Sequence, residues 1–149
     1  MQSYTHSKSR LFLLELVLAI FIFAVSASIC AQVFTKAYTV SRDAKSLSQA
    51  VRLAENAAAM IDASVKEGRD PFFYLLREYP KSEETDGVFT AWFDKDMAGC
   101  GKPDAVYSLE ISCSEEETGL QKADITIQRL SDTVTVHQLN KLYHIPNTP

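Results

Sequence analysis

The chain has 149 residues, a formal net charge of −4 and 46% hydrophobic residues, which fits one domain of ordinary size. The acidic balance, with no basic patch interleaved with aromatic residues, argues against nucleic acid as a partner. The sequence contains no nucleophile signature, phosphate loop, CxxC pair or HExxH motif, so we expect neither an enzyme nor a cofactor-binding protein.

The first glycine is Gly68 and the first proline is Pro71, which leaves residues 11–67 free of helix breakers. We predict one uninterrupted helix over this stretch. Its first part, residues 11–31, is almost wholly apolar, whereas residues 32–67 are amphipathic. The apolar part has 21 residues, about 31 Å as a helix, and predicts a transmembrane segment.

The leader, residues 1–10, carries Lys8 and Arg10 and no acidic residue. The positive-inside rule places this leader in the cytoplasm and the C-terminal part outside the membrane. The chain is therefore expected to be a single-pass membrane protein. A secretory signal peptide is the alternative interpretation, with Val25-Ser26-Ala27 as its small-residue cleavage site.

Glu15 is a lone acid within the apolar segment. An ionisable group inside a membrane is costly and marks a functional site by default. The alternative is that Glu15, one turn inside the segment, reaches the headgroups.

The run from Arg10 to Ile20, RLFLLELVLAI, resembles the N-terminus of type IV pilins and type II secretion pseudopilins. In that family a short basic leader ends in glycine, and the glutamate is fifth after the cleavage site, as Glu15 is fifth counting from Leu11. The resemblance implies processing between Arg10 and Leu11 and self-assembly through Glu15, Leu11 and Phe12. It also implies other pilin-like subunits and a membrane assembly machinery as partners, and a pilin-like α+β fold.

The sequence departs from the family pattern at the processing site. Arg10 stands where the family has glycine, and Leu11 replaces the usual phenylalanine, with Phe12 beside it. If the leader stays on, no free amine forms at Leu11, and Glu15 needs another partner, such as Arg10 or Lys8 of an adjacent chain. A minor subunit fits this departure. The alternative is an uncleaved single-pass protein that displays a small extracytoplasmic binding or adaptor domain.

The amphipathic stretch 32–67 carries small or apolar residues that alternate at spacings of four and three, which is typical of one packing seam on a helix. We expect this seam to pack on the chain's own sheet rather than on a second chain, with residues 33–40 left for contacts between subunits. The seam residues are Val33, Ala37, Val40, Ala44, Leu47, Val51, Ala54, Ala58, Ile61 and Val65.

The remaining residues, 68–149, predict a head with a small antiparallel sheet, which together with the helix gives an α+β fold. Gly68 ends the long helix, and Asp70-Pro71 starts a short helix at 71–79. Polar residues 81–87 predict an exposed loop. Alternating or β-rich patterns predict strands at 88–94, 107–114, 123–128 and 134–142, with a charged turn at 115–119.

Two further features of the head bear on chemistry. Cys100 and Cys113 both fall outside the predicted membrane segment, and the sequence leaves open whether they form a disulfide or stay as free thiols. Asp94, Asp96 and Asp104 surround a glycine-rich turn and supply oxygen ligands that suit Ca²⁺. Their spacing matches no EF-hand, so we predict no metal site.

Overall fold

The first element of the chain is helix α1, Tyr4–Lys66, in a computed structural model that describes residues 4–117 and 119–144. The helix starts before the predicted residue 11, so residues 4–10 of the leader are helical. No glycine or proline stands in that stretch to stop it. Residues 1–3 of the leader lie outside the described residues.

Helix α1 ends as predicted at a glycine. Gly68 has a φ of 67°, a left-handed conformation that costs glycine little. Its N–H donates to the Val65 carbonyl at 3.0 Å, and the Arg69 N–H donates to the Ser64 carbonyl at 2.9 Å. These two hydrogen bonds are the Schellman motif, which satisfies carbonyls that the last turn leaves open.

The short helix α2 is Phe73–Glu78, two residues later at its start than the predicted 71–79. Asp70 still organises the entry, because its carboxylate accepts a hydrogen bond from the Phe72 N–H at 2.8 Å. Pro71 and Phe72 form a turn that precedes the helix.

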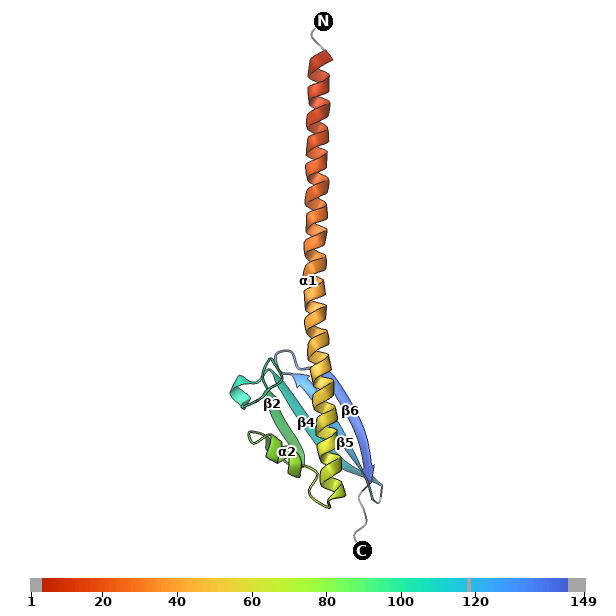
Figure 1. Ribbon diagram of the computed structural model, residues 1–149, viewed down its shortest axis with the longest axis vertical. Coiled ribbons are helices and arrows are strands. Elements are labelled where there is room, and N and C mark those ends of the chain that lie inside the picture. Colours follow the sequence, from red (N-terminus) through yellow and green to blue (C-terminus); the bar gives the residue numbers. More distant parts are fainter. Residues whose placement is uncertain (1–3, 118, 145–149) are drawn as a thin grey trace. The chain divides into compact units, whose positions relative to one another are not determined.

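The head contains a six-stranded antiparallel sheet of order β1-β2-β4-β5-β6, with β3 pairing β2 (Figure 1). Together with α1 this confirms the predicted α+β class. A short 3-10 helix, Lys102–Asp104, precedes β4. The strands are β1 Glu83–Thr85, β2 Val88–Phe93, β3 Gly99–Cys100, β4 Tyr107–Glu117, β5 Leu120–Arg129 and β6 Val134–His144.

The expected loop at 81–87 is wrong in part, because it contains β1. Asp86 and Gly87 have φ values of 54° and 76°, so they form a tight two-residue turn that pairs β1 with β2. Two positive φ angles in succession are typical of a type I′ hairpin, and Asp-Gly favours it. The expected turn at 115–119 is also shorter, because β4 continues to Glu117. Residue 118 lies outside the described residues.

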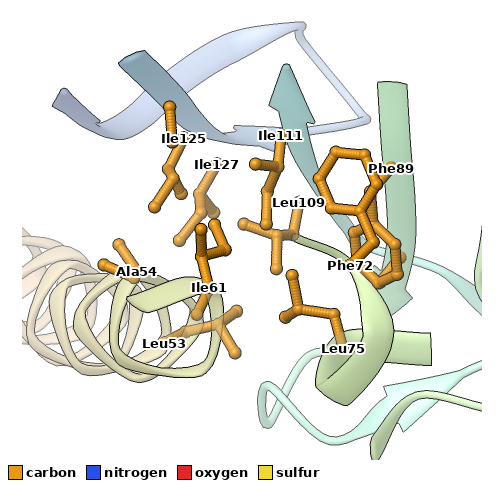
Figure 2. Close-up of a cluster of buried hydrophobic side chains, with 14 of the residues drawn as sticks. Leu53, Ala54, Ile61, Phe72, Leu75, Phe89, Leu109, Ile111, Ile125 and Ile127 are labelled. Carbon is orange, nitrogen blue, oxygen red and sulfur yellow. The ribbon is translucent and has the colours of Figure 1, made fainter. Parts of the chain in front are cut away.

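One face of the sheet is covered by the last turns of α1 and by α2 (Figures 1 and 2). Figure 2 shows Ile61 of α1 pointing toward the β5 isoleucines, and Leu75 of α2 pointing toward Leu109. Burying such side chains contributes roughly 1.5–3 kcal/mol each. The largest fully buried hydrophobic side chains are Ile61, Leu75, Phe89, Phe93, Leu109, Ile111, Ile125 and Ile127.

The lower part of the predicted seam packs on the chain's own sheet, as expected. Its four last members, Ala54, Ala58, Ile61 and Val65, are buried. Ala50, Leu53 and Ala57 are buried as well. A helix lying on a sheet buries a wider stripe than the narrow seam of a coiled coil, which explains these additions.

The chain divides into two units, Met1–Asp43 and Ala44–Pro149. The first unit holds the apolar part of α1 and the upper seam, whose residues Val33 and Val40 are exposed. The second unit holds the last turns of α1, α2 and the whole sheet.

Candidate assembly site on helix α1

Helix α1 is long and apolar enough to cross a membrane. None of the residues in its 18-residue apolar stretch is buried within the protein. Membrane anchors and signal sequences share such a length and composition. The predicted assembly residues Leu11 and Phe12 are 64% and 66% exposed, and Glu15 is exposed one turn further on. Leu11 and Glu15 are four residues apart and so lie on the same helix face.

The hydroxyl groups of the apolar segment have partners within the helix. Each donates a hydrogen bond to the carbonyl four residues earlier, which satisfies it without water. The pairs are Ser26 to Ile22 at 2.9 Å and Ser28 to Ala24 at 2.9 Å, and Thr35, just beyond the segment, donates in the same way to Ala31 at 3.0 Å.

Glu15 differs from these hydroxyls. Among the residues whose side chains are described, its carboxylate makes no hydrogen bond or ion pair. Arg10 is five positions away, which turns it about 140° around the helix from Glu15. A carboxylate that lacks a partner is costly wherever its surrounding is apolar.

The predicted processing site lies on regular backbone. The peptide bond between Arg10 and Leu11 is inside α1, with helical residues on both sides. The structure thus places Arg10, Leu11, Phe12 and Glu15 within two turns of one helix.

The structure does not bring the cysteine pair together, so of the two alternatives that the sequence left open it has the free thiols. Cys30, Cys100 and Cys113 are free. Cys100 pairs with Trp92, which pairs on its other side with Ser108 of β4. Cys113 is five residues further along β4, so the two cysteines are about 16 Å apart along the strands and about 9.5 Å apart across them. A disulfide needs Cα atoms within about 7 Å.

The candidate calcium ligands serve other purposes. One Asp94 carboxylate oxygen accepts hydrogen bonds from the Asp96 N–H at 2.9 Å and the Ala98 N–H at 3.0 Å, which closes the turn between β2 and β3. Asp104 lies in the separate 3-10 helix. Within residues 4–117 and 119–144, no group of three His, Cys, Asp or Glu side chains is placed to hold a metal ion.

Two features of the second unit carry no obvious sequence signal. One is a groove of about 630 Å³ between α1 and α2, with Ala59, Met60 and Ala63 on one wall and Tyr74, Arg77 and Glu78 on the other. The other is the outer edge of β6. Both features depend on how helices and strands pack against each other. The hydrophobic periodicity of the sequence gives no information about that packing.

No protein-family model, curated protein or solved structure matches this chain. A candidate function therefore rests on the residues of α1 and of the sheet.

Proposed function

We propose that the chain is a membrane-anchored, pseudopilin-like minor subunit that assembles through its N-terminal helix into a type IV pilus or type II secretion-like filament. The supporting observation is Glu15, a lone carboxylate in the membrane-length part of α1 that has no hydrogen bond or ion pair with any residue whose side chain is described. The same helix supplies the core of an antiparallel α+β unit. This is the layout that the N-terminal resemblance implies.

In this proposal the leader with Lys8 and Arg10 is cytoplasmic and the sheet is extracytoplasmic. Glu15 of one subunit pairs with a cation of its neighbour. That cation is the amine of Leu11 if the leader is cut, or Arg10 or Lys8 if it is not. Because water is scarce in the bilayer, the attraction is much stronger than at a protein surface, and it fixes the register between neighbouring helices.

Cysteine crosslinking in membranes tests the role of Glu15. With Cys100 and Cys113 replaced by serine, Cys30, exposed on α1, is the remaining thiol, and a bifunctional maleimide then reports contact between neighbouring anchors. We expect Glu15→Ala to reduce the crosslinked species by about tenfold or more, because an uncompensated cation is left in the apolar layer. Glu55→Ala, an exposed acid of the same helix in the second unit, is the matched control and is expected to change nothing. Unchanged crosslinking in Glu15→Ala contradicts the proposal.

A second function is favoured by Arg10 in the place of glycine. Here the chain stays uncleaved and displays a small extracytoplasmic binding or adaptor domain. Intact mass of the membrane-extracted chain separates the two. A cut after Arg10 supports the filament subunit, whereas a full-length chain that never co-purifies with other pilin-like subunits supports the adaptor. A released chain that begins near Ser28 contradicts both.

A further inference from the structure

Helix α1 changes character where its uncharged stretch ends. No charged residue lies between Glu15 and Lys36. At 1.5 Å per residue, Lys36 lies about 7 Å along the helix beyond Ala31, the last residue of the predicted membrane segment. The headgroup layer on each side of a bilayer is about 5–8 Å thick. A membrane that covers residues 11–31 therefore has its lipid phosphates at the level of Lys36.

Two aromatic side chains flank this first charge. Phe34 is 77% exposed and Tyr38 is 74% exposed, which makes them among the most exposed large side chains of the described residues. Between them, Thr35 and Thr39 each donate a hydrogen bond at 3.0 Å to the carbonyl four residues earlier, so neither hydroxyl requires water. A tyrosine, with an apolar ring and a polar hydroxyl, is favoured where the membrane meets water.

The charge of this segment is opposite to that of the chain beyond it. Residues 32–42 contain Lys36 and Arg42 and no acid, whereas residues 43–149 contain 11 basic and 18 acidic side chains. Lys36 and Arg42 are both exposed, and neither forms an ion pair with a residue whose side chain is described. The basic charge thus lies directly next to the membrane-length stretch, where an anionic lipid surface attracts it.

We propose that residues 32–42 form an interfacial segment that binds the headgroups of anionic phospholipids, with Lys36 and Arg42 on the phosphates and Tyr38 at the interface. This inference rests on the membrane anchor of the proposed function, but not on which leaflet the segment meets. The Cα–Cβ bonds of a helix tilt toward its N-terminus, so these side chains extend back toward the apolar stretch. Arg42 lies about 9 Å further along the helix than Lys36, which is about one Debye length at physiological salt.

The interfacial segment leaves room for contacts between subunits. Phe34, Tyr38 and Arg42 follow each other at a spacing of four and so share one face of α1. The upper part of the packing seam is centred about 130° away around the helix, at Val33, Ala37 and Val40. A neighbouring helix can therefore pack on the seam while lipid covers the other face.

Fluorescence quenching in vesicles tests the proposal on the full chain. With Cys100 and Cys113 replaced by serine, a bimane label is attached to Cys30, which is six residues and about 9 Å before Lys36. The labelled chain is placed in phosphatidylcholine vesicles that contain a small share of nitroxide-labelled lipid, either phosphatidylglycerol or phosphatidylcholine. The ratio of the two quenching constants gives the preference of the helix for the anionic lipid.

We expect the natural residues to give a preference of about fivefold or more, because each basic residue near an anionic surface strengthens binding by about this factor. In K36Q/R42Q the preference is expected to fall close to one. In 1 M salt it is expected to fall as well, since the Debye length is then about 3 Å. The control R52Q/K95Q removes two exposed cations of the second unit and is expected to keep the preference.

The possible failures have separate meanings. Equal quenching by the two lipids, or an unchanged preference in K36Q/R42Q, overturns the proposal and leaves the membrane anchor standing. A preference that arises only at a high ratio of protein to lipid also overturns it, because contacts between copies then produce the effect. Absence of quenching by either lipid means that Cys30 is outside the bilayer, which contradicts the membrane anchor of the proposed function as well.

Discussion

At the scale of single residues, Tyr143 and Cys113 form a partly buried polar contact in the head. The Tyr143 hydroxyl donates a hydrogen bond to the Cys113 Sγ at 3.1 Å, and only 5% of Tyr143 is exposed. Burial raises the pKa of both groups above their usual values, and the hydrogen bond offsets a small part of this for the thiol. The folded state therefore favours the neutral phenol and thiol.

This pair predicts a loss of stability in alkaline solution. A pKa raised by folding contributes stability that is complete below the unfolded pKa, about 8.5 for cysteine and 10 for tyrosine, and disappears as the pH rises through the folded value. We expect Tyr143→Phe to reduce the fall in unfolding free energy between pH 8 and pH 11 by about 1 kcal/mol. Urea unfolding followed by Trp92 fluorescence measures it. Tyr38→Phe, at an exposed position, is the control, and an equal effect of both variants contradicts the prediction.

Gly68 is a second residue with a specific role. Because its φ is 67°, alanine there is expected to cost about 1 kcal/mol of unfolding free energy. The control is Gly101→Ala, since Gly101 has a φ of −85° and the added Cβ meets its nearest neighbour, Pro103, at an ordinary 3.6 Å. Thermal unfolding compares the two. A smaller loss at Gly68 than at Gly101 is the outcome that contradicts this assignment.

At the scale of elements, the close approach of α1 to the sheet depends on small residues. Ala58 is 4% exposed and faces the sheet, whereas its neighbour Ala59 is exposed and lines the groove toward α2. We expect Ala58→Leu to destabilise the fold by about 1–3 kcal/mol through overpacking and Ala59→Leu to change it by less than about 0.5 kcal/mol. Chemical unfolding measures both. Equal effects mean that α1 is rotated relative to the described packing.

Much of the element structure follows from the sequence. Gly68 marked the end of α1, and alternation predicted β4 and β5, whereas Asp70-Pro71 predicted the start of the short helix two residues too early. Strands β1 and β3 have three and two residues, which is too short for any periodicity to show. The Asp86-Gly87 dipeptide was the available signal for β1. The sequence left the pairing of Cys100 and Cys113 open because cysteine spacing along the chain does not fix strand register.

The candidate sites also differ in how well the sequence predicts them. Glu15 is an outlier in its own segment, so composition alone singles it out. The free edge of β6 depends on strand order: a meander leaves its first and last strands at the edges, and alternation along the chain does not distinguish a meander from other orders. Strand order is set by long-range packing, and the residue pattern of a single sequence does not show that packing.

At the scale of the whole molecule, the core belongs to the second unit. The buried hydrophobic residues of the cluster begin at Ala50, and the division of the chain falls before it, between Asp43 and Ala44. In residues 44–149 there are 11 basic and 17 acidic side chains, which favours solubility once the apolar segment is removed. We therefore expect residues 44–149 to fold without the apolar part of α1.

Two truncations test this independence. A fragment of residues 44–149 keeps every residue of the buried cluster, and we expect it to be soluble and to unfold cooperatively by circular dichroism. A fragment of residues 57–149 lacks Ala50, Leu53 and Ala54 and uncovers part of β5. It is expected to lose on the order of 4 kcal/mol or more, a large share of a stability of about 5–15 kcal/mol, and to be largely unfolded. If the 44–149 fragment is unfolded, the apolar part of α1 contributes to the fold of the sheet. If the 57–149 fragment unfolds as cooperatively as the longer one, the last turns of α1 are not the cover that the sheet requires.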